Sequence, residues 1–334
     1  MSSLHDQEKS YSYFTLPKVK LNDMIVSNDK FLNNMRKHIL DCTRKYPSDL
    51  IYYNWLKGAY KNFKNENKKT VMYLVKEFEM KKAATAYKRS STDKTGTIDP
   101  LKLKDYKFSD DIFKRLTITP DAKNHGMIMM LDWSGSMCDS IKQTTEQLMN
   151  LVWFCQKVNI PYEVYFFTSE IGESAWSTNA KKNGEEVFTY KYGDAIMDKC
   201  HLVCIAKNGM KKTKLDESLM YIWSMALSYH GRYSSHTGTG GRMWEGDNFN
   251  CPSEYYLGST PLNQAIVALN EMIPIFKNKN KIEKMSVITL TDGGANWCFG
   301  STMGDDNKSD LVHGSTPVIK VGKKSYTTPT DGRF

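Results

Sequence analysis

Three separate segments of the chain carry oxygen-bearing side chains that could form one ligand site. The first follows the apolar run GMIMML and reads DWSGSM, which supplies Asp132, Ser134 and Ser136. The second, YLGSTPLNQ, places Thr260 directly before an amphipathic segment, and the third, VITLTDGG, supplies Asp292. These residues supply two carboxylates and three hydroxyls but no histidine or thiol. Such hard oxygen ligands are the kind that Mg²⁺ or Mn²⁺ prefers. The residue types therefore predict a divalent-cation site if the three segments meet.

The same residues could instead have a structural or a catalytic role. Ser and Asp are common helix N-caps, which would account for one serine but not for the second serine, Thr260 and Asp292. A phosphotransferase of the haloacid-dehalogenase kind needs a second carboxylate where this chain has Ser134. WSGSM does not fit the G-x-S-x-G pattern of serine hydrolases, and no G-x-x-x-x-G-K-[ST] loop is present. We therefore expect neither ATP hydrolysis nor another catalytic activity from this chain alone.

Alternating strands and helices are predicted around these segments. Short apolar runs predict buried strands at 126–132, 162–168 and 284–290, and helical periodicity predicts helices over 140–156, 215–230 and 260–276. This rhythm indicates an α/β fold with a mostly parallel sheet and helices on both faces. In such sheets the loops after the carboxyl ends of the strands share one crevice, which would bring the three segments together.

A helical, basic region with a connector is expected over residues 1–108. We expect a poorly ordered tail at 1–25 and helices between 30 and 87, with Val71, Leu74, Val75 and Phe78 as an apolar stripe. Residues 89–108 are expected to form a turn-rich connector. Residues 1–125 hold 25 basic and 15 acidic residues, against 21 and 22 in the remainder. The lysines alternate with Asn and Glu at helical spacing, which favours a solvated helix face that docks on a partner over nucleic-acid binding.

The remaining chain, 109–334, is expected to form the α/β domain, with insertions at 170–212 and 230–258. Residues 300–334 predict at most one strand, at PVIKV, so we expect the domain to be incomplete at its C-terminus. An edge strand and a covering helix would then be missing, and 293–334 would form a hairpin over the metal site. Seven scattered cysteines, with no signal peptide and no membrane-spanning apolar run, predict reduced thiols in the cytoplasm.

The five site residues resemble the metal-ion-dependent adhesion site of von Willebrand factor A domains. Asp132-x-Ser134-x-Ser136, Thr260 and Asp292 match its motif in order and between the expected elements. The resemblance implies a von Willebrand A-type, Rossmann-like fold. It also implies that the two serines and the threonine bind the metal directly or nearly so, while the aspartates act largely through water. An acidic side chain of a partner would complete the shell.

The chain also resembles, over about residues 70–300, the cobaltochelatase T subunit and related chelatase subunits, including similar chains of tailed phages. The segments that carry this resemblance are GTIDPLKL, SDDIFKR and GMIMMLDWSGSM. This resemblance implies a metal-dependent interaction module that works with an AAA+ ATPase of the MoxR or cobaltochelatase type. It would act in the cytoplasm of a bacterium or a phage-infected cell. One alternative is a non-catalytic subunit of a cobalt or magnesium chelatase in tetrapyrrole (cobalamin) biosynthesis. Another is a basic nucleic-acid-binding phage protein.

Overall fold

A computed structural model describes most of the chain. The described residues are 11–89, 91–101, 107, 113–118, 124–169, 187–197, 199–230, 249–295, 301–303, 309–311, 316–321 and 323–327. Residues 1–10 of the predicted tail, 170–186 of the first predicted insertion and 231–248 of the second lie outside the described residues.

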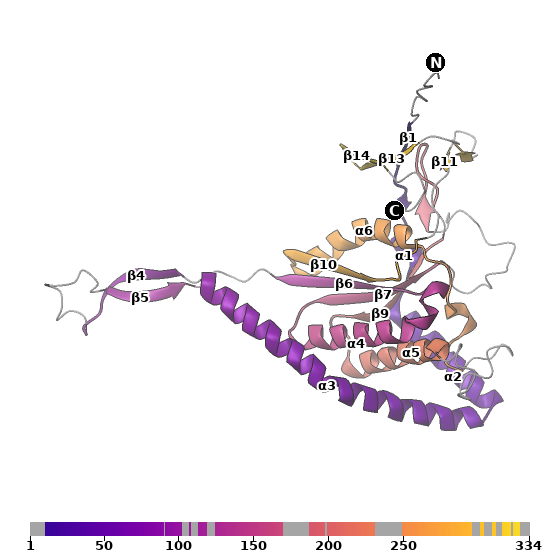
Figure 1. The fold of residues 1–334 in the computed structure, drawn as a ribbon, viewed down its shortest axis with the longest axis horizontal. Helices are drawn as coiled ribbons and strands as arrows, with labels where there is room; N and C mark the ends of the chain where they lie inside the picture. Colours follow the sequence, from indigo (N-terminus) through magenta and orange to yellow (C-terminus); the bar gives the residue numbers. More distant parts are fainter. Residues whose placement is uncertain are drawn as a thin grey trace, which may run out of the picture.

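The fold is built around a five-stranded sheet with the strand order β10-β6-β7-β9-β3 (Figure 1). β10, β6 and β7 are parallel, β9 runs antiparallel to β7, and β3 is parallel to β9. The strands are β3 (Ile25–Val26), β6 (His125–Asp132), β7 (Tyr162–Thr168), β9 (His201–Lys207) and β10 (Lys284–Leu290). The structure thus confirms an α/β fold with a mostly parallel sheet.

Helices cover both faces of this sheet. On one face lie α2 (Asn28–Lys45), α4 (Ile141–Lys157) and α5 (Lys212–His230), and on the other lies α6 (Leu262–Asn280). Alternate residues of β6 face opposite layers, so Met129 and Leu131 join the first core while Ile128 and Met130 join the second. All four are fully buried, which explains the uninterrupted apolar run of this strand.

The strand β10 coincides with the predicted one, but its predicted burial is wrong. Its residues are exposed or half-buried, and Val287 is 37% exposed. Among the described residues β10 pairs only with β6, so it forms an edge of the sheet. An apolar run identifies a strand but does not reveal whether the strand lies at the centre or the edge.

The predicted insertion at 170–212 is wrong over its last part, because β9 lies there as an inner strand of the sheet. Leu202, Val203 and Ile205 of β9 are fully buried between the helices of the two faces. β9 runs antiparallel to its neighbour β7, and the described residues between the two strands form no helix. It therefore does not follow the strand-helix-strand rhythm by which the other strands were found. The short β8 (Phe188–Thr189) also lies in this segment.

The N-terminal segment 11–25 is ordered, which corrects the prediction of a poorly ordered tail. It forms β1 (Tyr11–Thr15), β2 (Lys18–Val19) and α1 (Leu21–Met24), and then enters β3. β1 pairs with the distant β13, and β2 pairs with β8. Phe14, Val19 and Met24 of this segment are buried, the last two in the core on the α6 side of the sheet. Elements of two to five residues show too little periodicity to be found from local sequence.

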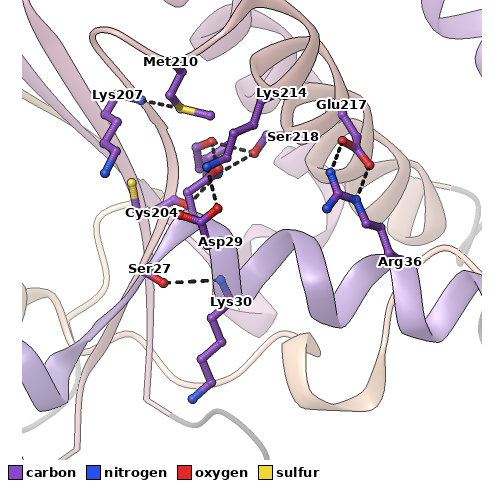
Figure 2. A network of polar contacts seen from close by, with 12 residues as sticks. Ser27, Asp29, Lys30, Arg36, Cys204, Lys207, Met210, Lys214, Glu217 and Ser218 are labelled. Atoms are coloured by element: carbon purple, nitrogen blue, oxygen red, sulfur yellow. Dashed lines mark hydrogen bonds and ion pairs between the residues drawn. The ribbon is translucent and has the colours of Figure 1, made fainter.

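Polar contacts fix α2 to β9 and α5 (Figure 2). The buried Asn28 amide donates to the Ile205 carbonyl at 2.8 Å and to the Ser218 hydroxyl at 2.9 Å. Arg36 forms two hydrogen bonds, of 2.7 and 2.6 Å, with the Glu217 carboxylate, and this contact lowers the pKa of Glu217. The N-terminal region therefore belongs to the same packed body as the sheet.

A single long helix, α3 (Ser48–Arg89, 42 residues), covers the predicted helical region from residue 48 to residue 87. It runs along α4 and α5 and then leaves the body toward a β-hairpin (Figure 1). The predicted apolar stripe is buried only in part: Val71 is buried, Val75 and Phe78 are half-buried, and Leu74 is exposed. Phe78 packs edge-on against Phe154 of α4, with ring centroids 5.5 Å apart.

The predicted connector at 89–108 is wrong for its first part, which forms a strand. β4 (Ser91–Ile98) pairs antiparallel with β5 (Phe113–Ile118), and the hairpin projects from the end of α3 (Figure 1). The segment STDKTGTI has no apolar alternation, so its pairing with β5 could not be read from its own residues.

The predicted strand at PVIKV is confirmed as β13 (Thr316–Val321), but it is not the only strand in the C-terminal segment. β14 (Lys324–Thr327) pairs antiparallel with β13, and β11 (Ser301–Met303) pairs with β12 (Ser309–Leu311). Two antiparallel pairs therefore form within 293–334. Their placement over the metal segments stays a prediction.

The packing of α2 against the core can be tested by mutation. Phe31 of α2 is fully buried, and its ring lies 5.5 Å from that of Tyr255 and 6.4 Å from that of Phe166. Phe31→Ala should lower the free energy of unfolding by about 3–5 kcal/mol, because it leaves a cavity in the core. The measurement is urea denaturation of the full chain.

The matched control is Leu40→Ala on the same helix, since Leu40 is 48% exposed. This change should alter the unfolding free energy by less than about 0.5 kcal/mol. Similar small effects of both changes would contradict the packing of α2 described here.

Candidate metal site

The site begins where β6 ends. Asp132 is the last residue of β6 and is fully buried, Ser134 is 1% exposed, and Ser136 is exposed in the 3₁₀ helix η2 (Gly135–Asp139). The intervening Trp133 is buried in the α4–α5 core, where its indole N–H donates to the Tyr255 carbonyl at 2.8 Å. Anchoring Trp133 on that face directs Asp132 toward the α6 side of the sheet, because successive side chains of a strand alternate.

The segment before α6 runs directly beside this loop. Ser134 and Gly258 form a parallel β-bridge, the Gly135 N–H donates to the Gly258 carbonyl at 2.9 Å, and the Gly258 N–H donates to the Trp133 carbonyl at 3.2 Å. Thr260, two residues further on, is buried. The first two predicted segments therefore meet through backbone hydrogen bonds.

Gly258 is required for this approach. A Cβ atom at this position would lie 2.5 Å from the Thr168 hydroxyl oxygen and 3.0 Å from that of Ser169. Both residues stand at the end of β7, and the Ser259 N–H donates to the Ser169 hydroxyl at 2.9 Å. Any larger residue at 258 would push the Thr260 segment away from the sheet.

The third segment meets Asp132 through a residue next to the predicted one. The Thr291 hydroxyl donates to Asp132 Oδ2 at 2.6 Å, and Thr291 in turn accepts from the Gly293 N–H at 3.2 Å. Gly293 has a φ of +99°, a conformation that favours glycine. Asp292 is exposed, and its charge acts on Asp132. All three predicted segments therefore converge at one end of the sheet.

The surroundings of Asp132 make the charged form of its carboxylate unfavourable. Burial raises the pKa of Asp132 to about 6, and the negative charge of Asp292 adds to this rise, while the hydroxyls of Thr291 and Ser134 oppose it. Asp132 Oδ1 is buried and has no hydrogen-bond partner among the described residues. Nearby, the hydroxyl oxygens of Ser134 and Ser136 lie 3.1 Å apart.

These residues fit a small divalent cation. A buried carboxylate oxygen without a partner is costly and calls for a positive charge, and the surrounding donors are hydroxyl and carboxylate oxygens. Within the described residues, no three His, Cys, Asp or Glu side chains gather as a metal site. The candidate site therefore depends on two carboxylates combined with hydroxyls, a donor set suited to Mg²⁺ or Mn²⁺ rather than to zinc.

Two residues of this region were missed by the sequence analysis. Thr291 directly precedes the predicted ligand Asp292. A hydroxyl side chain next to a predicted ligand could have marked Thr291 as part of the site. Thr168 ends β7, and its hydroxyl is buried without a partner among the described residues. A hydroxyl residue at the end of the strand next to β6 could have been found by the same rule that selected Asp132.

Comparison of the chain with protein-family models and with curated proteins gave no match. Within the described part of the chain, no helix has the length and apolar character needed to cross a membrane.

The contact between Thr291 and Asp132 can be tested by stability in the presence of a chelator. Thr291→Val keeps the size of the side chain but removes the donor to Asp132. We expect the free energy of unfolding to fall by about 1–3 kcal/mol, because a buried carboxylate oxygen loses its partner. Urea denaturation in EDTA measures the difference.

Thr289→Val, two residues earlier in β10, makes the same chemical change at a half-buried position. It should alter the unfolding free energy by less than about 0.5 kcal/mol. Equal losses in the two variants would show that the hydroxyl of Thr291 has no special role.

Proposed function

We propose that this chain is a metal-ion-dependent protein-interaction module with a Mg²⁺ or Mn²⁺ site of the von Willebrand A type. The observation that carries the proposal is the buried Asp132, at the meeting point of three polar segments, with one oxygen that no described residue contacts by a hydrogen bond. The resemblance of these segments to the adhesion site supports the same conclusion.

The residues that would hold the cation divide into two groups. Ser134, Ser136 and Thr260 would supply hydroxyl oxygens, and Asp132 and Asp292 would supply carboxylates. When bound, the cation supplies a Lewis-acidic centre that accepts a carboxylate from another protein. The three hydroxyls are neutral, and the resemblance implies that the two aspartates act largely through water, so the cation would keep its affinity for one more carboxylate.

Neighbouring residues hold these donors in place. Thr291 fixes one oxygen of Asp132 by its 2.6 Å hydrogen bond, so the other oxygen keeps its direction. Gly258 lets the Thr260 segment approach β7, and the bridge to Ser134 fixes its register. The donors are therefore positioned mainly by backbone pairing, which favours a preorganised binding site.

Recognition fits this site better than catalysis. The segments 132–140, 258–262 and 291–295 contain no histidine or lysine, and their one cysteine, Cys138, contacts the Tyr229 carbonyl. The hydroxyl of Ser134 lies beside that of Ser136 rather than beside a base. Activating a serine nucleophile requires an adjacent base. A bound cation and exposed oxygen donors are sufficient for capturing an acidic side chain.

The partner that we propose is an AAA+ ATPase of the MoxR or cobaltochelatase type, or its client, presenting an Asp or Glu. The resemblance over residues 70–300 supports this choice, as does the charge of the chain, with a net +9 that is concentrated in residues 1–125. A basic surface would steer an acidic partner toward the site. We place this interaction in the cytoplasm.

Metal binding is tested by titrating Mg²⁺ and Mn²⁺ into the full chain by calorimetry, with thermal unfolding as a second readout. We expect saturable binding, and a stabilisation of about 2.7 kcal/mol at a free ion concentration one hundred times Kd. Asp132→Asn should abolish both. In chelator this variant should be at least as stable as the wild type, since a neutral amide costs less to bury than a carboxylate.

Asp139→Asn is the matched control, because Asp139 is an exposed carboxylate of the same loop. It should bind the metal like the wild type. Metal binding that survives Asp132→Asn, or a folded wild type that binds neither ion, would contradict the proposed site.

Partner binding is tested with purified MoxR-type ATPases from the organism that encodes this chain. An ATPase should bind the wild type in Mg²⁺, and Ser134→Ala combined with Ser136→Ala should abolish binding without unfolding the chain. Because such an ATPase itself uses Mg²⁺, the variant rather than a chelator decides the result. Ser140→Ala, an exposed serine beside the loop, is the control. Equal binding by the double variant would contradict a role of the site in recognition.

A further inference from the structure

A groove of about 520 Å³ lies between three helices on the side of the body opposite α6. Its walls are the middle of α3, the end of α4, and the turn that leads into α5. The charged residues of its lining are Lys64, Lys68, Lys157, Lys212 and Asp216. This volume matches that of small-molecule sites.

The groove is strongly positive. Four lysines and one aspartate line it, which gives a net charge of +3. Asp216 is already paired with Lys64, and the Lys64 ammonium lies 5.9 Å from the centre of the Trp153 ring. Lys68, Lys157 and Lys212 make no ion pair with any described residue. Three like charges therefore face one space without a counter-ion from the described protein.

The start of α5 adds to this positive field. Lys212 is the first residue of α5, and the first turn of this 19-residue helix contains no acidic side chain. The first N–H groups of a helix lack partners within it, and the helix dipole makes this end positive. Phosphate groups bind readily at such an end when cationic side chains surround it.

The lining also indicates which anion would fit. It contains lysines but no arginine, and lysine ammonium groups bind phosphate as point charges. Val71, Met72, Trp153 and Met210 form an apolar wall beside the lysines. The volume exceeds what a single phosphate fills, so there is room for a chain of phosphates or for an organic group.

This groove is distinct from the metal segments. β9 runs antiparallel to β7, so its last residue, Lys207, pairs with Glu163 at the beginning of β7. Met210 follows β9, and Lys157 ends α4 shortly before β7 begins. The groove therefore lies at the end of the sheet where β7 starts, and the metal segments lie at the end where β7 stops.

We propose that the groove between α3, α4 and α5 binds a small phosphate-bearing anion. The anion engages Lys68, Lys157 and Lys212 together with the first turn of α5. The phosphates could come from a nucleotide or from a linear polyphosphate, and both share the chemistry that the lysines recognise.

The test is calorimetric titration of the full chain with tripolyphosphate, ATP and inorganic phosphate in EDTA, so that no divalent cation is bound. We expect saturable 1:1 binding of tripolyphosphate. Lys68→Gln combined with Lys212→Gln should weaken it about tenfold or more, as expected for the loss of two charged contacts. Lys157→Gln alone, at an independent position, should weaken it severalfold.

The matched control is Lys76→Gln combined with Lys82→Gln, since both lysines are exposed on α3 but do not line the groove. This control should bind like the wild type. Tighter binding of ATP than of tripolyphosphate would support a nucleotide, and equal binding would support the phosphates alone.

Three outcomes would overturn the proposal. The first is the absence of saturable binding of both polyphosphates, and the second is an equal loss of affinity in the groove and control variants. The third is binding of a hexaglutamate peptide as tight as that of tripolyphosphate, which would assign the groove to acidic peptides. Because the titration contains no free divalent cation, none of these outcomes depends on the metal site.

Discussion

The strand β6 is covered by helices on both faces, and the candidate site depends on this burial. Helices lie on either side of this strand, so its last residue, Asp132, is buried even though it is a carboxylate. The rise of its pKa to about 6 means that ionisation in the folded protein is about 3 kcal/mol less favourable than in water. Thr291 satisfies one oxygen, and the other has no partner among the described residues. Buried polar atoms are nearly always paired, so an unpaired buried carboxylate oxygen calls for a bound ion or water.

The N-terminal region contributes to the same constraint. Phe31 of α2 contacts Phe166 of β7, and β3 extends the sheet beyond β9. α3 packs on α4 through Phe63 and Trp153, whose rings are 5.9 Å apart. The helices that bury β6 on this face are thus held in turn by residues that precede β6 in sequence. Two regions that differ in charge and periodicity along the chain share one hydrophobic core.

The sequence predicted those parts of the fold that depend on local composition. β6, β7 and β10 are apolar runs bounded by polar loops, and the rule that loops gather at the carboxyl ends of parallel strands brought Asp132 and Asp292 together. The contact between Thr291 and Asp132 depends on register instead: Leu290 pairs with Leu131, which places the next two residues side by side. The register of the strands, and the pairing of the short β3 and the antiparallel β9, depend on residues far along the chain. Local sequence patterns do not reveal such partners.

The two candidate ligand regions lie at opposite ends of α4. Its N-terminal end follows the metal loop, and its C-terminal end carries Lys157. With 17 residues α4 is about 25 Å long, roughly three Debye lengths at physiological ionic strength. Charges at its two ends therefore interact weakly through solvent. One physical route for coupling between the metal segments and the groove is movement of α4 against α3, α5 and β6, which all contact it.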